Sequence, residues 1–133
     1  MIAFSVPLRA VGKARPRVTR HGVFTPAATK GFESAVAWAA KAAMGGQQPL
    51  DGPVALSVRI ALKRPKSARK RAAPTTKPDI DNVAKAILDA LNGIAFVDDA
   101  RVTRLCISKI YDDADSVRVV IAPDEGEDHG GRL

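Results

Sequence analysis

The stretch VALSVRIAL, residues 54–62, has the clearest β-strand pattern in the chain. Its large apolar side chains alternate with Ala, Ser and Arg, and this period of two is typical of a strand that turns one face toward a hydrophobic core. A shorter alternation over residues 2–8 predicts a second strand. Residues 101–112 and 116–122 are two further strand-like runs, and the acidic turn between them predicts that they form a β-hairpin.

Two other segments carry apolar residues at the spacings of three and four that indicate amphipathic helices. The first helix is expected over residues 26–44, where the pair Gly45-Gly46 ends the pattern. The second is expected over residues 80–91, because Asp79 is well placed as its N-cap and Asn92-Gly93 can close it. These elements together predict an α+β fold in which two main helices pack on a small mixed or antiparallel sheet.

The length of the chain indicates one domain. A chain of 133 residues can bury a substantial core but divides poorly into two domains. The domain is expected over residues 1–122, and residues 123–133, which lack core side chains, are expected to form a flexible tail. Neither a long apolar run nor a secretion signal is present, so we expect a cytoplasmic protein with no membrane partner. The only cysteine, Cys106, has no cysteine to pair with and is expected to fill the core.

The charge of the chain favours a polyanionic partner. Lysines and arginines outnumber aspartates and glutamates by 21 to 14, and nucleic acid fits this excess better than a membrane because the basic residues do not lie on an amphipathic helix. They gather in residues 11–24, expected to be a loop or short hairpin, and in a second loop, residues 63–77. The residues expected to contact DNA are Lys13, Arg15, Arg17, Lys63, Arg64, Lys66, Arg69, Lys70 and Arg71.

Against this positive charge, five aspartates gather in KPDIDNVAKAILDALNGIAFVDDARV, residues 77–102. Structural roles could explain most of them, as a cap for Asp79, a favourable helix-dipole position for Asp81 and a turn for Asp98 and Asp99. However, Asp79 at the cap could swing beside Asp81, and two carboxylates so close would repel each other without a cation. A third carboxylate, from Asp98 or Asp99, could join them if the following strand begins beside the N-terminus of the helix.

The chemistry of these side chains suits a hard divalent cation. Oxygen-only ligation, without a cysteine or histidine, is typical of Mg²⁺, and Mn²⁺ is expected to substitute for it. Lys85 follows Asp81 by one helical turn, so it could pair with that carboxylate or neutralise a phosphate in a transition state.

Besides an enzyme, two other kinds of protein could carry this charge pattern. One is a non-catalytic basic DNA-binding domain in which the aspartates are structural, and the other is a small interaction module whose acidic turn pairs with a basic partner. The DNA-binding domain would gain nothing from carboxylates beside a basic loop, because they repel phosphate unless a cation intervenes. The interaction module explains neither basic loop.

The motifs resemble those of a known family. KPDIDN, then Lys85, DALNG and VDDARV are similar to the signature of the RusA family of Holliday junction resolvases, and GKARPR with GVFTP and Glu33 resembles its N-terminal motif. The resemblance spans residues 1–121. It implies a homodimeric, Mg²⁺-dependent crossover junction endodeoxyribonuclease, which cuts four-way DNA junctions by paired symmetric cleavage in recombination and repair.

The resemblance also implies which residues act. Carried over by position, the essential acidic residues of the family fall on Asp79, Asp81 and Asp99, with Asp98 adjacent as a further candidate ligand. The essential lysine of the family falls on Lys85.

Overall fold

The computed structural model describes residues 1–13, 17–20, 22–24, 27–68 and 70–126. The elements in these residues follow in the order β1 (Ile2–Val6), β2 (Arg17–Thr19), β3 (Gly22–Phe24), α1 (Ala27–Met44), β4 (Val54–Lys63), η1 (Lys66–Ala68), α2 (Ile80–Leu91), η2 (Asp99–Arg101), β5 (Val102–Asp112) and β6 (Ser116–Pro123), where η marks a short 3₁₀ helix.

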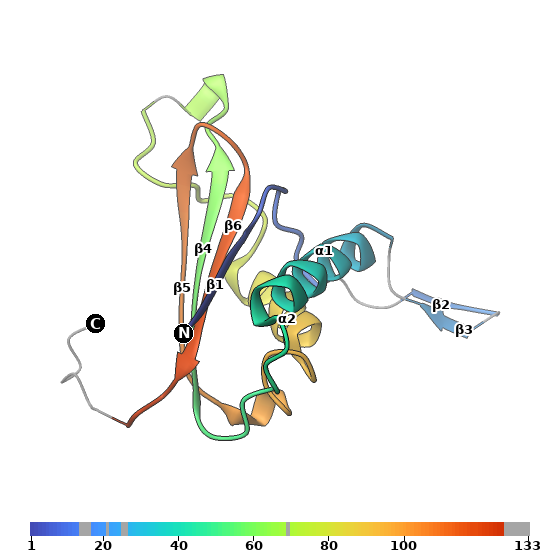
Figure 1. Ribbon diagram of the computed structural model, residues 1–133. Helices are drawn as coiled ribbons and strands as arrows, with labels where there is room; N and C mark the ends of the chain where they lie inside the picture. The colour runs from blue at the N-terminus through green and yellow to red at the C-terminus, as the bar shows by residue number, and fades with distance from the viewer. Residues whose placement is uncertain (14–16, 21, 25–26, 69, 127–133) are drawn as a thin grey trace.

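The main sheet has four strands in the order β1-β6-β4-β5, and α1 and α2 cover one of its faces (Figure 1). β6 runs antiparallel to both of its neighbours, whereas β5 runs parallel to β4, so the sheet is mixed. β2 and β3 pair with each other as a separate short hairpin, as the pattern of residues 11–24 allows. The predicted α+β fold, one small domain with two helices packed on a mixed sheet, is confirmed.

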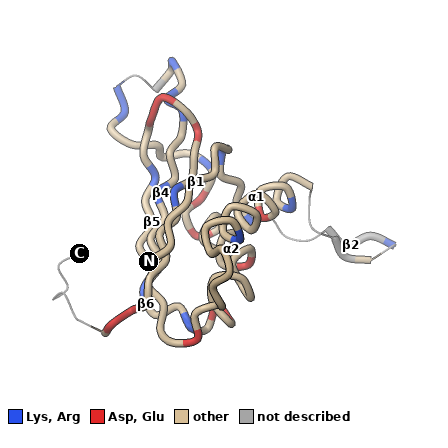
Figure 2. Tube along the Cα trace, in the orientation of Figure 1, with Lys and Arg blue, Asp and Glu red and all other residues tan. Residues whose placement is uncertain are grey.

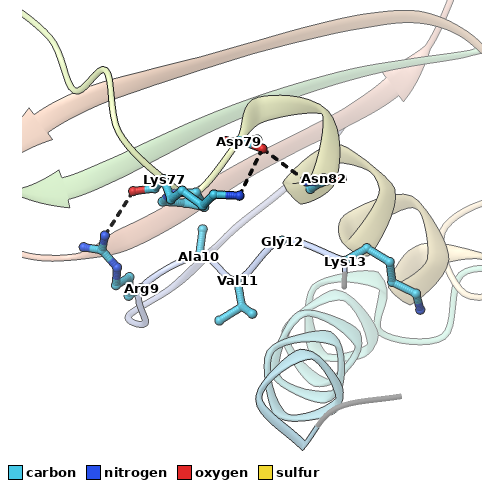
Figure 3. Close-up of a pocket in the computed structure, with 9 residues that line it drawn as sticks. Arg9, Ala10, Val11, Gly12, Lys13, Lys77, Asp79 and Asn82 are labelled. Atoms are coloured by element: carbon cyan, nitrogen blue, oxygen red, sulfur yellow. Dashed lines mark hydrogen bonds and ion pairs between the residues drawn. The ribbon is translucent and has the colours of Figure 1, made fainter. Parts of the chain in front are cut away.

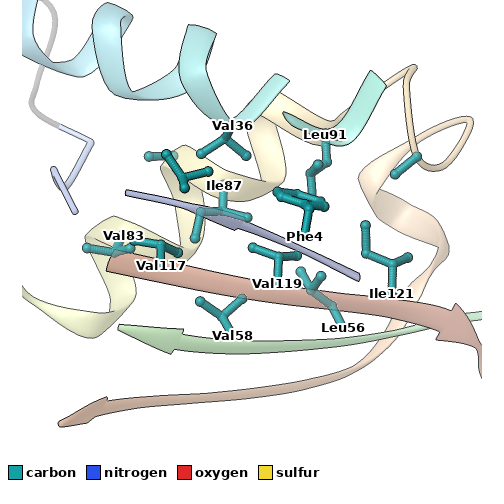
Figure 4. Packing of buried hydrophobic residues seen from close by; sticks show 14 of the residues in the cluster. Phe4, Val36, Leu56, Val58, Val83, Ile87, Leu91, Val117, Val119 and Ile121 are labelled. Carbon is teal, nitrogen blue, oxygen red and sulfur yellow. The ribbon is translucent and has the colours of Figure 1, made fainter. Parts of the chain in front are cut away.

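The strand β4 lies at the centre of the hydrophobic core. The alternating apolar side chains of β4 point toward the helices, and each is at most 3% exposed. The apolar positions expected from helical spacing in α1 and α2 meet them across the layer (Figure 4), and they include Phe32, Val36, Ala40, Val83, Ile87 and Leu91. Full burial of an aliphatic side chain contributes about 1.5–3 kcal/mol, so this packing fixes α2 against the sheet.

The predicted hairpin between the last two strands is wrong, although the bounds of both strands are close to those expected. β4 lies between β5 and β6 in the sheet, and the short acidic connection passes over the end of β4. Two hydrogen bonds hold it there, from the Lys63 N–H to Asp115 Oδ1 (2.8 Å) and from the Arg64 N–H to the Asp112 carbonyl (3.2 Å). A connection of this length can therefore span two strand spacings, each about 4.8 Å, and does not require that its flanking strands pair.

The expected burial of Cys106 is also wrong, because this residue is exposed. It lies on the edge strand β5, and its partner in the register, Ser57 of β4, is exposed as well. Since paired positions in a sheet point to the same side, Cys106 lies on the face that carries no helix. Cys106 has apolar neighbours in the sequence, and these suggested a position in the core. The alternation of side chains along β5 instead places Cys106 on the exposed face of the sheet.

The beginning of the predicted tail is tied to the domain. The Asp124 N–H donates to the Pro53 carbonyl (2.8 Å), and the Asp124 carboxylate accepts a hydrogen bond from Thr103 Oγ1 (2.7 Å), which lowers its pKa. The rest of the predicted tail, residues 127–133, lies outside the described residues. Within the described part of the chain, no helix has the length and apolar character needed to cross a membrane.

Candidate functional site

Asp79 is the N-cap residue of α2, as predicted, with an extended backbone (φ −77°, ψ 139°). Its carboxylate makes no capping hydrogen bond to the helix. Instead, Asp79 Oδ2 lies 3.6 Å from Lys77 Nζ and 3.4 Å from Asn82 Nδ2 (Figure 3). The Asp79 side chain is 46% exposed, so its oxygen atoms are open to a ligand.

Asp81 and Lys85 lie on successive turns of α2, and both are exposed. The salt bridge that this spacing permits does not form, and neither side chain has a hydrogen bond or ion pair with another described residue. A carboxylate and an ammonium group are thus both available to molecules from solution at the same end of the helix.

Asp98 and Asp99 lie at the other end of α2. After Leu91 the chain turns tightly, with the Gly93 N–H bonded to the Phe96 carbonyl (2.8 Å), so η2 forms beside the C-terminal end of the helix (Figure 1). With 12 residues, α2 is about 18 Å long. One chain therefore does not bring Asp99 to Asp79, because β5 begins where α2 ends and not beside the N-terminus of α2.

The position of Lys109 gives an independent measure of this separation. Lys109 Nζ donates to the Pro78 carbonyl, immediately before Asp79, over 3.1 Å. Lys109 is seven residues beyond Val102, the start of β5, which corresponds to about 23 Å along a strand. Asp99 precedes Val102, so the strand and the helix place it at a similar distance from Asp79.

These positions decide which metal site a single chain can offer. Among the described residues, no three acidic, cysteine or histidine side chains come together as a metal site. The N-terminus of α2 nevertheless presents two carboxylates, Asp79 and Asp81, without a competing capping bond. Mg²⁺ is commonly bound by one or two carboxylates together with water and substrate phosphates, so this end of the helix fits such an ion when the DNA is present.

A pocket of about 350 Å³ adjoins Asp79, between the segment that follows β1 and the N-terminus of α2 (Figure 3). Its charged lining includes Arg9, Lys77 and Asp79. The backbone of the segment contacts α2 directly, since the Lys13 N–H donates to the Asn82 carbonyl over 2.9 Å. The segment after β1 thus forms one wall of the site.

Gly12 permits this close contact, and we predict that Gly12→Ala disturbs it. An added Cβ would lie 2.8 Å from Asn82 Cβ, so α2 or the segment must shift. The free energy of unfolding is expected to fall by about 1–3 kcal/mol, as for an overpacked core. Urea denaturation of Gly12→Ala and of the wild-type protein measures this change in the free energy of unfolding. Gly31→Ala is the control, because it adds a methyl group in open space on α1 and should stabilise the helix by about 0.5–1 kcal/mol. Equal effects of both substitutions would contradict the contact.

Lys13, expected to contact DNA, is engaged within the protein. Its Nζ lies 2.7 Å from Glu33 Oε1 of α1 and 3.2 Å from Asp89 Oδ2 of α2. The hydrogen bond to Glu33 raises the pKa of Lys13 above its ordinary value of 10.5; partial burial opposes the shift and Asp89 adds to it. The raised pKa means that this cluster stabilises the fold at neutral pH, and that its contribution is lost as the pH rises through the pKa of the folded state. The sequence shows that Lys13 is positively charged, but it does not show where the side chain points.

The second basic loop presents several cations above the ends of β4 and β5 (Figure 2). Arg64 is partly used within the protein, since its guanidinium stacks 4.4 Å from the centre of the Tyr111 ring and donates to the Arg71 carbonyl. The side chains of Lys63, Lys66, Lys70 and Arg71 are exposed. Arg15 and Arg69 lie outside the described residues, and the side chain of Arg17 is not described.

Three residues of the site were missed by sequence reasoning: Arg9, Lys77 and Lys109. Arg9 Nη2 donates to the Lys77 carbonyl over 3.2 Å, and Lys109 donates to the carbonyls on either side of it. One signal could have identified Lys109. In the alternation of β5 it occupies the same face as Ile107, and a lysine at an inward position needs an internal partner.

The exposed basic loop and the two carboxylates at the N-terminus of α2 suit a protein that acts on the phosphodiesters of nucleic acid, and comparison with known proteins defines its class. The family model described as endodeoxyribonuclease RusA matches residues 7–122. The chain therefore belongs to the RusA endodeoxyribonuclease family, which confirms the resemblance of its motifs. Membership makes it a nuclease, in a family of Holliday junction resolvases that generally depend on a divalent metal ion.

A bacterial relative extends the relationship over nearly the whole chain. The uncharacterized protein YqaN of Bacillus subtilis (strain 168) is 36% identical over an alignment 135 residues long, and the aligned part covers 90% of this chain and 94% of that protein. Its description assigns no activity, so it supports the family and not a particular substrate.

Proposed function

We propose that the protein is a crossover junction endodeoxyribonuclease that resolves four-way DNA junctions by paired symmetric cuts, in recombination and repair, with Mg²⁺ as cofactor. The observation that carries this proposal is that Asp81 and Lys85, at the N-terminus of α2, have no hydrogen bond or ion pair with any other residue that the structure describes. Opposite charges one helical turn apart stabilise a helix when they pair. Because both side chains are exposed to solvent, Asp81 is available to a bound cation and Lys85 to a phosphate.

In this proposal Asp79 and Asp81 hold the metal ion through their carboxylate oxygens, and Mn²⁺ is expected to substitute for Mg²⁺. The ion would supply an activated water and stabilise negative charge on the scissile phosphate. Lys85 offsets the charge that develops on that phosphate from one turn further along α2. The exposed basic side chains of residues 63–71 hold the DNA backbone.

Asp99 enters the proposal through a homodimer. Because it lies at the far end of α2 in its own chain, it can join Asp79 and Asp81 only if a second copy supplies it. A twofold axis would form two such sites at once, each with Asp79 and Asp81 of one protomer and Asp99 of its partner. Each part of the shared site has an exposed apolar side chain beside it. Ile80, between Asp79 and Asp81, is 36% exposed, and Val97, shortly before Asp99, is 42% exposed. These are the side chains that contact between two copies would cover.

Cleavage of a synthetic four-way junction tests the proposed function. The wild-type protein is expected to nick opposing strands of the junction with Mg²⁺ or Mn²⁺, and to leave a linear duplex of the same sequence uncut. EDTA should abolish cleavage but not binding. Binding should weaken as salt rises, because basic side chains release counterions when they contact phosphates. A protein that binds junctions but cuts none with either metal would instead be a non-catalytic DNA-binding domain.

A further inference from the structure

The backbone that leads into Asp79 is held by two cations from distant parts of the chain. Lys109 Nζ, on β5, donates to the carbonyl oxygens of Thr76 (2.7 Å) and Pro78 (3.1 Å). Arg9, which follows β1, donates from Nη2 to the carbonyl oxygen between them, that of Lys77, over 3.2 Å. β1 and β5 are the two edge strands of the sheet, so these residues, here named the carbonyl clamp, reach the segment from opposite sides.

The clamp orients the three peptide carbonyl groups that precede Asp79. Residues 72–79 belong to no helix or strand, so no regular hydrogen-bond ladder fixes their peptide planes. Pro78 lacks an N–H group, and the Asp79 carboxylate contacts the side chains of Lys77 and Asn82 without a capping bond to the helix backbone. Hydrogen bonds from a charged donor are about twice as strong as neutral ones, so Lys109 and Arg9 set the direction in which the chain enters α2.

Lys109 is poorly placed to contact DNA. It lies on the helix-facing side of β5, opposite the fully buried Ile60, and is itself only partly exposed. An ammonium group has three N–H donors, and the two carbonyl oxygens accept from two of them. Its positive charge therefore acts on the backbone beside Asp79.

We propose that Lys109 is a positioning residue for the metal-binding carboxylates, with Arg9 as the weaker second member of the clamp. By fixing the carbonyl oxygens of Thr76 and Pro78, Lys109 holds the carboxylates of Asp79 and Asp81 where both can bind one divalent cation. This inference rests on the proposed function for the role of the two aspartates. The inference adds Lys109, a residue of the sheet, to a site whose carboxylates lie in the helical layer.

Lys109→Met tests the clamp, because it removes both hydrogen bonds and keeps an aliphatic side chain. The rate constant of cleavage is expected to fall about 10²-fold, since small displacements of reacting groups have effects of this size. The Kd for the junction should stay within about a factor of two, because Lys109 contacts no phosphate in this role. Lys109→Arg can still donate to two carbonyls and should recover about tenfold of the lost rate. Lys41→Met, at an exposed position on α1, is the matched control and should cut like wild type.

A second readout does not depend on cleavage. Mn²⁺ binding to the protein without DNA, followed by electron paramagnetic resonance well below the unfolding temperature, should weaken about 10-fold in Lys109→Met, as for other residues that orient metal ligands. Lys109→Arg should restore most of this affinity. A residue that only stabilises the fold would lower the unfolding temperature and leave the affinity of the folded protein unchanged.

Several results would overturn the inference. Lys109→Met could cut and bind Mn²⁺ like Lys41→Met, or its entire defect could appear in the Kd for the junction. If Lys109→Met does not fold, Arg9→Gln replaces it. The expected loss is about threefold in rate and in Mn²⁺ affinity, smaller than the roughly tenfold effect typical of orienting residues, because Arg9 makes one exposed hydrogen bond to the segment. No loss would refute the clamp. A wild-type protein that binds Mn²⁺ but cuts no junction would refute the proposed function alone, and the Mn²⁺ comparison would still decide the role of Lys109.

Discussion

Asp81→Asn is expected to abolish metal-dependent junction cleavage, with a loss of about 10³-fold or more in the rate constant. The Asp81 side chain is exposed and has no partner among the described residues, so its negative charge is available to a cation. A neutral amide keeps the shape and loses this charge. A metal ion contributes several kcal/mol to a phosphoryl transition state, and each 1.4 kcal/mol corresponds to about tenfold in rate. Single-turnover cleavage of a four-way junction at saturating protein measures the effect.

Folding and binding should survive the substitution. Asp81 interacts favourably with the N-terminus of α2, and loss of that interaction costs only about 0.3–1 kcal/mol. Without metal, the junction should bind at least as tightly, because one repulsive charge has been removed. Asp113→Asn, in the exposed turn before β6, makes the same chemical change away from α2 and should cut normally. If Asp81→Asn retains more than about a tenth of the wild-type rate, Asp81 does not hold the catalytic ion. Loss of that ion would remove several kcal/mol of transition-state stabilisation.

The helices and strands could be predicted from the sequence because their signals are local. Alternation over residues 54–62 and helical spacing over residues 80–91 depend only on which side of each element faces the core. Strand pairing is different, since it depends on contacts between segments far apart in the chain. The short acidic connection before β6 is compatible with a hairpin, yet β4, whose apolar side chains are almost fully buried, lies between β5 and β6.

The same limit applies to the candidate site. Asp79, Asp81 and Lys85 could be located together because one helix carries all three, and helical geometry fixes their spacing. The location of Asp99 depends on where β5 begins, which the sequence leaves open. The direction of a basic side chain is also not a local property. Lys13 looks like a DNA contact in the sequence, but its ammonium group lies between carboxylates of α1 and α2.

Mixing two inactive variants is expected to restore cleavage, provided that the active site is shared between protomers. Asp81→Asn and Asp99→Asn should each be inactive as homodimers, because every site lacks one carboxylate. In a heterodimer, one shared site carries both substitutions and the other carries neither. Heterodimers purified through two different affinity tags should therefore nick at about half the wild-type rate, since one of two equivalent sites is intact. They should produce nicked junctions and few resolved ones.

A matched heterodimer makes this result specific. Asp79 and Asp81 lie on the same end of the same helix, so they enter the same shared site. A heterodimer of Asp79→Asn with Asp81→Asn leaves each site with one defect, and it should remain inactive. The same experiment with Asp98→Asn in place of Asp99→Asn tests whether the adjacent aspartate is the ligand instead. Both residues are exposed, Asp99 in η2 and Asp98 at its start.

The outcomes of the mixing experiment separate the possible arrangements of Asp99. Recovery with Asp99→Asn but not with Asp79→Asn requires that Asp99 acts across the dimer interface. Inactivity of both heterodimers would place all the essential carboxylates in one chain, which the structure permits only if α2 and β5 rearrange by about the length of the helix, 18 Å. Full activity of the Asp99→Asn homodimer would remove Asp99 from the ligand set and leave Asp79 and Asp81 to bind the ion with water and phosphate.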